Sequence, residues 1–197
     1  YFSRRPELQL LIRVHPAEIR GSLPSRQLVV DEIKKAFPEL PENIFIIPPQ
    51  SQISTYAAMM PCNAVIIYGT KTGVELTSMK IPVIVAGEAW VRNKGITMDA
   101  SSMEDYLKIL DRLPLKQSLD EATVQRARKY AYHFFFRRMI PLEFMEPTGG
   151  SPPYKMQLTG LRDLQPGNCR GLDIICEGIL KGTDFIYPAE EYLKSAR

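Results

Sequence analysis

The sequence predicts an α/β fold built on a doubly wound parallel sheet, followed by a helical C-terminal extension. Short apolar runs rich in β-branched residues recur through the first half, each bounded by Gly, Pro or Asn, as in strands covered on both faces. Segments with the period of amphipathic helices separate these runs, and such alternation is typical of doubly wound sheets. The alternation stops after Leu113, and a long segment rich in Arg and aromatic residues follows.

The apolar runs locate the expected strands, and the amphipathic segments locate the expected helices. We expect strands at residues 10–14, 44–47, 64–68, 82–86 and 95–100. We expect helices at residues 25–37, 102–113 and 120–139, with Ser102 as an N-cap, and one or two short helices in 169–182. The sequence PTGGSPP at 147–153 predicts a break, because Gly pairs and Pro cannot continue a helix. The expected domains are a Rossmann-like domain at 1–115 and a helical extension at 116–197 that packs on it.

Composition narrows the functional class. A length of 197 residues suits one domain or one large lobe of a bigger protein, and because the first residue is Tyr1 we expect a fragment. The net charge of +3 is too small for a nucleic-acid footprint. Cys62, Cys169 and Cys176 show no C-x-x-C spacing, which disfavours a disulfide framework or a zinc site and favours a reducing cytosol. Without a signal peptide or an apolar run of about 18–20 residues, we expect a cytoplasmic protein.

The sequence GTKTGVE at 69–75 lies between an expected strand and an expected helix. Such a turn can bind phosphate through backbone amides at the helix start, with the glycines allowing close approach and the other side chains adding hydroxyls and a cation. The contacting residues would be Gly69, Thr70, Lys71, Thr72 and Gly73. The alternative is a capping box, Thr72-x-x-Glu75, which satisfies the helix amides without any ligand. The turn matches neither a Walker A loop nor a G-x-G-x-x-G pattern, and both interpretations stay open.

The sequence RVHPAE at 13–18 follows the first expected strand. Pro16 keeps His15 out of helical geometry, and an imidazole at a strand end can donate a hydrogen bond to a phosphate or a leaving oxygen. Arg13 could supply positive charge. His15 is one of only two histidines, and its strand end should share a sheet edge with residues 69–75. The alternative is a structural histidine.

Three further stretches each allow two interpretations. Ser51, Gln52 and Ser54 could contact a base or ribose, or could cap the next helix. Trp90 could form an aromatic wall of a cleft or could pack in the core. The basic and aromatic run at 126–139 could touch an anionic membrane surface or another domain, or could be a solvated face with a buried aromatic stripe. No His, Cys and carboxylate cluster has metal-ligand spacing, and there is no G-x-S-x-G nucleophile elbow.

Taken together, three sequences resemble the bacterial capsule polysaccharide biosynthesis glycosyltransferases, which include enzymes similar to Kdo transferases. They are IRVHPAE, ISTYAAMMPCNAVIIYGTKTGVELTSMKIPVIVAGEAW and GLDIICEGIL, and the resemblance covers roughly residues 9–100 with a weaker match near the C-terminus. It implies a GT-B fold, in which two Rossmann-like halves enclose a cleft. This chain resembles the C-terminal half, which binds the nucleotide-sugar donor without a metal or other cofactor.

By this resemblance, His15 and residues 70–73 would bind the donor phosphate of a CMP- or UDP-linked sugar, and Glu75 would reach the ribose or the sugar. Lys71 departs from the small residue expected at its position in many relatives. The N-terminal half, which binds the acceptor and usually supplies the general base, is absent from these residues. We therefore assign no catalytic residue, and expect this chain alone to bind a nucleotide weakly and turn over little or nothing.

Two rival functions remain on the sequence alone. CDP-glycerol phosphotransferases and nucleotide-sugar 2-epimerases share the same architecture and similar phosphate-binding turns. A non-catalytic binding module, in which the turn at 69–75 only caps a helix, is the other rival. The expected partners are a nucleotide sugar and the missing acceptor-binding domain, with no nucleic acid, and the basic run leaves peripheral contact with the inner membrane open.

Overall fold

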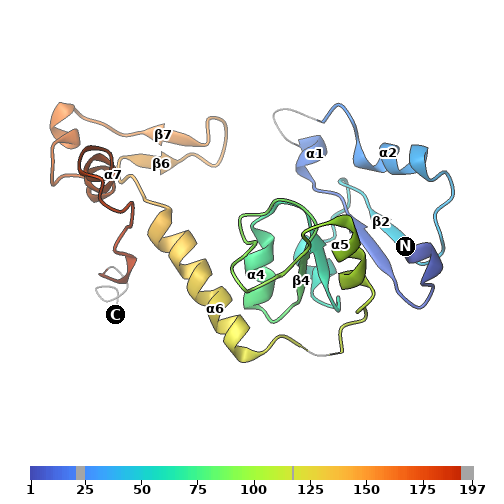
Figure 1. Cartoon of the computed structure of the whole chain (residues 1–197). Helices are drawn as coiled ribbons and strands as arrows, with labels where there is room; N and C mark the ends of the chain where they lie inside the picture. The colour runs from blue at the N-terminus through green and yellow to red at the C-terminus, as the bar shows by residue number, and fades with distance from the viewer. Residues whose placement is uncertain (21–24, 117, 192–197) are drawn as a thin grey trace. The chain divides into compact units, whose positions relative to one another are not determined.

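The computed structural model describes residues 1–20, 25–116 and 118–191 (Figure 1). It confirms a mixed α/β fold with small parallel sheets and several helices. The chain divides into two compact units, Tyr1–Val124 and Gln125–Arg197, and each is described by itself.

The first unit alternates strands and helices, as the sequence predicts. After a short 3-10 helix η1 (Phe2–Arg4), its strands are β1 (Leu10–Arg13), β2 (Ile44–Ile47), β3 (Val65–Ile67), β4 (Val83–Val85) and β5 (Met98–Asp99). Its helices are α1 (Ala17–Arg20), α2 (Val29–Ala36), α3 (Thr55–Met59), α4 (Thr72–Ser78) and α5 (Met103–Leu110). The expected strands are therefore confirmed with trimmed ends, and the last of them shrinks to two residues.

The strands form two small parallel sheets. Strand β1 pairs with β2, with Leu11 opposite Phe45, and β4 lies between β3 and β5. All of these pairings are parallel, so within each sheet the carboxyl ends of the strands lie at the same edge. A single wide doubly wound sheet was expected, and the ladders instead stop at two and three strands.

The core of the first unit surrounds β4. All three residues of β4 are buried, and Ile84 packs against Ile109 and Leu110 of α5. On the other face, Val83 lies beside Gly73 of α4, so helices cover β4 on both sides, as Figure 1 shows. Covering both faces explains why β4 reads as an uninterrupted apolar run, which is typical of parallel strands.

The sheet of β1 and β2 is covered differently. Leu11 and Phe45 face each other across the ladder and both remain exposed. Helix α2 also leaves much of its apolar face open, since Val29 and Phe37 are exposed. The amphipathic period of the sequence therefore located this helix correctly. Its apolar face is nevertheless not covered by the described residues.

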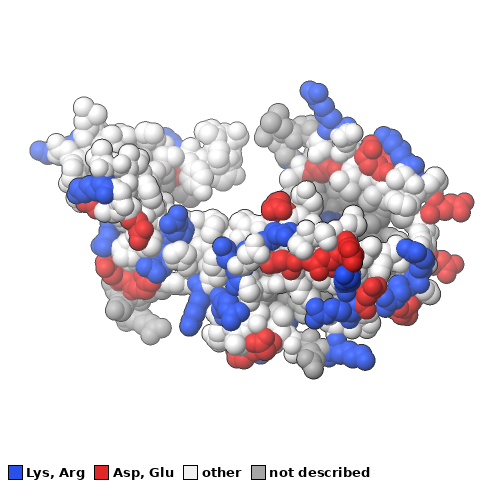
Figure 2. Space-filling view, viewed as in Figure 1, with Lys and Arg blue, Asp and Glu red and all other residues white. Residues whose placement is uncertain are grey.

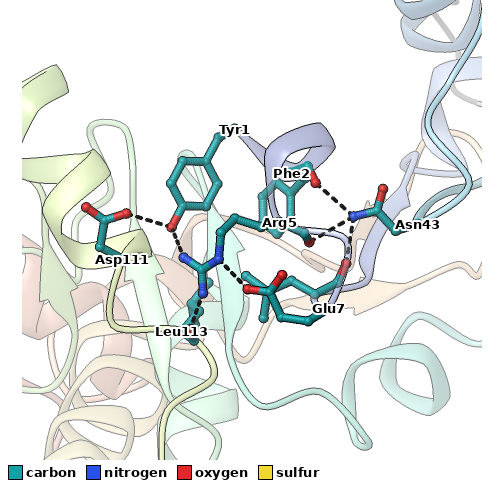
Figure 3. Close-up of polar contacts among 8 residues, drawn as sticks. Tyr1, Phe2, Arg5, Glu7, Asn43, Asp111 and Leu113 are labelled. Carbon is teal, nitrogen blue, oxygen red and sulfur yellow. Dashed lines mark hydrogen bonds and ion pairs between the residues drawn. The ribbon is translucent and has the colours of Figure 1, made fainter.

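Polar contacts tie the N-terminal segment to the residues that follow α5 (Figure 3). The Tyr1 hydroxyl donates to Asp111 Oδ1 over 2.9 Å, and the Arg5 guanidinium donates to the Tyr1 hydroxyl and to the Leu113 carbonyl, each over 2.9 Å. Arg5 also forms an ion pair with Glu7. Burial of the phenol, followed by its hydrogen bond to Asp111, raises the pKa of Tyr1.

Asn43 anchors the same segment to the start of β2. Its Nδ2 lies 2.9 Å from Phe2 O, 3.2 Å from Arg5 O and 2.8 Å from Leu8 O (Figure 3). One amide thus contacts three backbone carbonyls of the N-terminal segment, two of which, Phe2 O and Arg5 O, also accept backbone N–H groups of that segment.

The second unit begins within a long helix. Helix α6 (Glu121–Tyr132) continues without a break into a π-helical segment η2 (His133–Arg138), which confirms the long helix expected at 120–139. Later in the second unit come the short helix η3 (Leu161–Leu164) and helix α7 (Arg170–Lys181). Gly182 ends α7 in the left-handed conformation, with φ of 70°. No helix within residues 1–20, 25–116 and 118–191 is long and apolar enough to cross a membrane.

An antiparallel hairpin lies where only a break was predicted. Strands β6 (Met145–Pro147) and β7 (Tyr154–Met156) pair across the PTGGSPP sequence, and Thr148 N donates to Pro153 O over 3.0 Å within that turn. The glycines and prolines correctly marked a chain reversal, but strands of three residues are too short for their alternation to be recognised.

Replacing Asn43 with Asp tests the anchoring amide. The new carboxylate keeps the size of the side chain but has no donor for the three carbonyls, so we expect the free energy of unfolding to fall by about 1–3 kcal/mol. Urea unfolding followed by circular dichroism measures this change. Asn63→Asp, the same change at an exposed loop position, is the matched control and should alter stability by less than about 0.5 kcal/mol. Equal effects of the two substitutions would show that the three contacts contribute nothing.

Candidate functional site

The carboxyl end of β1 is joined to the loop after β2 by Arg13. Its Nη1 donates to Val14 O over 2.6 Å and to Pro48 O over 2.9 Å, and its Nη2 lies 3.4 Å from Ile53 O. The Nε of Arg13 is buried without a hydrogen-bond partner among the described residues. Arg13 therefore acts first as a clamp on residues 48–53. Its positive charge remains at the strand end, although carbonyl groups use its Nη donors.

His15 lies just beyond β1 and is exposed. The backbone N–H of Ala17 donates to its Nδ1 over 3.0 Å, so in the neutral imidazole the proton resides on Nε2. This contact orders the ring at the start of α1 and leaves Nε2–H as a hydrogen-bond donor. The structural and the functional interpretations of His15 are thus compatible, since one ring nitrogen serves each.

Glu18, in the same HPAE sequence, has a role that sequence reasoning missed. It is buried, and its Oε1 accepts the Val29 N–H over 2.7 Å at the start of α2. The N-cap of α2, Leu28, makes no side-chain cap bond, so Glu18 supplies from a distance what a local cap would supply. A carboxylate that caps a helix eleven residues away leaves no signal in sequence spacing.

The turn after β3 is held by its own threonines. Thr72 N lies 3.3 Å from Thr70 Oγ1, and the two hydroxyl oxygens lie 3.1 Å apart. Helix α4 begins with Lys71 as its N-cap, without a side-chain cap bond, so the capping box of Thr72 and Glu75 does not form. The Thr72 amide is already used within the turn, but its long bond can be exchanged for a better acceptor.

Glu75 instead contacts α3. The Tyr56 hydroxyl donates to Glu75 Oε2, and Lys71 Nζ lies 3.9 Å from Glu75 Oε1 as an i,i+4 ion pair. The hydrogen bond to this carboxylate, followed by burial, raises the pKa of Tyr56. Tyr56 lies nineteen residues before its partner, so only the tertiary fold reveals the pair.

Gly69 and Gly73, which the sequence presents as equivalent, have different roles. Gly69 is exposed, and a Cβ there would lie 3.4 Å from Glu88 O in the loop after β4. Gly73 is buried, and a Cβ there would lie 2.7 Å from Ile67 Cδ1 and 3.3 Å from Val91 Cγ2. Gly73 therefore allows α4 to approach the sheet closely, and only Gly69 remains available for close approach of a ligand.

The loops after β3 and β4 are in contact with each other. A Cβ at Gly87 would collide with Cδ2 of Tyr68, so the Tyr68 ring packs on this glycine. Arg92 holds the second loop in place, because its guanidinium donates to Gly87 O and Ala100 O over 2.8 Å each. Tyr68 is otherwise exposed and lies directly before Gly69. Tyr68 was not among the residues predicted for the site, because its packing partner Gly87 lies nineteen positions along the chain.

Contacts therefore link the four strand-end loops, each to the next. Arg13 joins the first to the second, the pair of Tyr56 and Glu75 joins the helix after the second to the helix after the third, and Tyr68 joins the third to the fourth. The sheet edge that His15 was expected to share with residues 69–75 does not form as one ladder, because β1 belongs to the two-stranded sheet and β3 to the three-stranded sheet. The loop after β1 offers an exposed imidazole, and the turn after β3 offers hydroxyls, a lysine and a carboxylate. These groups suit a ligand bearing both phosphate and sugar hydroxyls. Within the described ranges, no three His, Cys, Asp or Glu side chains are grouped to hold a metal ion.

Replacing Gly73 with Ala separates packing from ligand approach. The added methyl group meets Ile67 and Val91, so we expect a loss of about 1–2 kcal/mol in the free energy of unfolding despite better helix propensity. Ile67→Val removes the nearest atom, Cδ1. The double variant should therefore lose less free energy of unfolding than the two single variants lose together. A double-mutant cycle in urea measures this difference. Strict additivity would contradict the packing role.

Tyr56→Phe tests the pair with Glu75. We expect a loss of about 0.5–1 kcal/mol near pH 8, because a partly exposed hydrogen bond to a carboxylate is removed. The folded chain holds the Tyr56 proton more tightly than the unfolded chain, so this stabilisation is present below about pH 10 and is lost as pH rises through the raised pKa. The difference in stability between the two proteins should therefore shrink as the pH rises from 8 to above 10.

Unfolding in urea near both pH values provides the measurement. Tyr154→Phe is the matched control, since Tyr154 is 55% exposed and Tyr56 is 47% exposed. A pH-independent difference for Tyr56→Phe, or an equal effect of Tyr154→Phe, would contradict the pairing.

Comparisons with known proteins do not add a relative. No protein-family model, no curated protein and no solved structure matches this chain.

Proposed function

We propose that the first unit is the nucleotide-sugar-binding half of a metal-independent glycosyltransferase acting in capsule or surface polysaccharide synthesis. The observation that supports this function best is the linkage of four strand-end loops by Arg13, by Tyr56 with Glu75, and by Tyr68. Nucleotides bind to α/β folds at the carboxyl ends of parallel strands, where such loops gather. In this proposal, the two small sheets correspond to the doubly wound sheet of a GT-B C-terminal half.

Each side chain has a defined part in the proposed complex. The Nε2–H of His15 donates to a phosphate oxygen, since Nδ1 already accepts the Ala17 amide. The hydroxyl of Thr70 and the ammonium group of Lys71 contact the same phosphate. Arg13 contributes mainly its positive charge, because its Nη groups are bound to carbonyls. Glu75 accepts the Tyr56 hydroxyl at Oε2, and its Oε1, which lies 3.9 Å from Lys71 Nζ, would exchange that ion pair for a ribose or sugar hydroxyl.

The chemical contribution of these residues is stabilisation of the departing nucleotide. As the bond between the anomeric carbon and the phosphate oxygen breaks, negative charge grows on the phosphate. Fixed donors placed at that oxygen lower the barrier because they interact more strongly with the developing charge than with the ground state. Deprotonation of the acceptor hydroxyl is assigned to a separate domain, and no residue described here is given that role.

A titration with nucleotides tests the proposal. CMP, UDP and CDP are added separately to the whole chain up to millimolar concentration, and the melting temperature is followed. A nucleotide present at 100 times its dissociation constant should stabilise the protein by about 2.7 kcal/mol. Stabilisation by CMP alone favours transfer of a Kdo-type sugar, UDP favours hexosyl transfer or a 2-epimerase, and CDP favours a CDP-glycerol phosphotransferase.

Two substitutions at His15 separate its structural and binding roles. His15→Asn keeps an acceptor for the Ala17 amide but lacks the Nε2 donor, whereas His15→Ala lacks both. Both should weaken nucleotide binding about tenfold or more, and only His15→Ala should also lower stability. The matched control is His133→Ala, which removes the other histidine.

If both His15 variants bind the nucleotide with the same affinity as the parent chain, His15 has no role in binding. The absence of saturation with all three nucleotides would disprove the nucleotide site altogether and would favour a non-catalytic module. The buried packing role of Gly73 is the observation consistent with that rival.

A further inference from the structure

The second unit begins with a strongly cationic stretch of helix. Between Glu121 and Glu143 the chain contains no Asp or Glu. The basic residues in that interval are Arg126, Arg128, Lys129, Arg137 and Arg138. A cluster of this size with one sign of charge creates a local positive potential, even though the whole chain carries a net charge of only +3.

The helix places most of these cations on its outer side. Val124 and Ala127 are completely buried, whereas Arg126, Arg128 and Lys129 are exposed. Figure 2 shows several Lys and Arg side chains gathered along α6. Arg137 is different, because it forms an ion pair with Glu190 over 3.4 Å, and its backbone carbonyl accepts the Tyr187 N–H. Arg137 therefore supports the local fold and is not counted in the surface.

The π-helical segment adds large apolar side chains to the same stretch. Tyr132 and Phe136 stack with ring centroids 5.4 Å apart across the junction of α6 and η2. Phe136 is 55% exposed and Met139 is 51% exposed, and Arg138 lies exposed between them in sequence. A π-helical turn changes the direction of the side chains that follow it, which a regular helix pattern could not predict.

We propose that this basic–aromatic face, formed by Arg126, Arg128, Lys129, Phe136, Arg138 and Met139, docks on an anionic lipid bilayer. Cations combined with exposed Phe and Met side chains match a surface that offers negative headgroups above an apolar layer. A soluble polyanion would match only the cations. The helix would lie in the interfacial plane. The docking is independent of the proposed nucleotide site.

Pelleting with lipid vesicles tests this proposal on the whole chain. One set of vesicles contains phosphatidylcholine alone, and the other contains phosphatidylcholine with about one third phosphatidylglycerol. We expect binding to the anionic vesicles only, and this binding should weaken as the salt concentration rises. Removal of three cations in Arg126→Gln/Arg128→Gln/Lys129→Gln should lower the affinity about a hundredfold.

A matched charge control neutralises three exposed cations of the first unit. The variant Lys34→Gln/Lys94→Gln/Arg112→Gln has the same net charge as the helix variant, and it should bind anionic vesicles almost as well as the parent chain. A second variant, Phe136→Ser/Met139→Ser, keeps every cation. It should bind about tenfold or more weakly, because the apolar contribution to docking is lost.

Several results would overturn the proposal. Equal binding to neutral and anionic vesicles would exclude charge recognition, and equal loss in the two charge variants would show that only net charge matters. Full binding by Phe136→Ser/Met139→Ser would leave a general polyanion site in place of a membrane surface. Circular dichroism confirms that each variant is folded. The nucleotide-induced shift in melting temperature should be unchanged in all of them, so failure here is distinct from failure of the nucleotide site.

Discussion

Burial of β4 on both faces is the constraint on which the first unit depends. A central parallel strand gains stability when helices cover both of its faces. Helix α4 provides this cover through Gly73, and α5 provides it through Ile109 and Leu110, which pack on Ile84. Each fully buried Val, Leu or Ile contributes about 1.5–3 kcal/mol, so the few residues of this strand and its neighbours supply a large part of a domain's stability. Because β3, β4 and β5 are parallel, the same packing brings their carboxyl-end loops to one edge.

Polar side chains then determine how these loops are held. Arg13 and the pair of Tyr56 and Glu75 each connect a loop or helix to a neighbour that is distant in sequence, and Arg92 holds the loop after β4 through Gly87 O and Ala100 O. Most of these contacts are partly exposed, so each contributes little to stability, about 1 kcal/mol or less. Their effect is on geometry, since they order the loops that would contact a ligand and reduce the entropy lost on binding.

In the proposed site, the same residues combine structural and binding roles. His15 uses Nδ1 to order the start of α1, which would leave Nε2–H for a ligand, and Glu75 uses Oε2 for Tyr56 and Oε1 for the ion pair with Lys71. This division is economical because a side chain fixed by one atom presents its second atom in a defined direction. The second unit shows a comparable division, in which Arg137 stabilises the fold through Glu190 while its neighbours form the basic–aromatic face.

The sequence by itself determined the order and type of most elements, since short β-branched runs and amphipathic segments reflect local geometry. The runs at 44–47 and 82–86 became β2 and β4, Ser102 caps α5 by accepting the Asp105 N–H, and the helix expected at 120–139 spans α6 and η2. It also placed His15 and residues 69–75 just after strands, because strand ends are visible in the apolar pattern.

Only the tertiary structure decided which side chains meet and how far the sheets extend. The contacts of Arg13 with Pro48, of Asn43 with the N-terminal segment, of Glu18 with Val29 and of Tyr56 with Glu75 each join residues that are eleven or more positions apart, and nothing in local spacing encodes such contacts. Tertiary packing also separated the two glycines, since Gly73 lies against Ile67 while Gly69 remains exposed. The physical reason is the same in each case: propensity and periodicity depend on neighbours along the chain, whereas burial and pairing depend on neighbours in space.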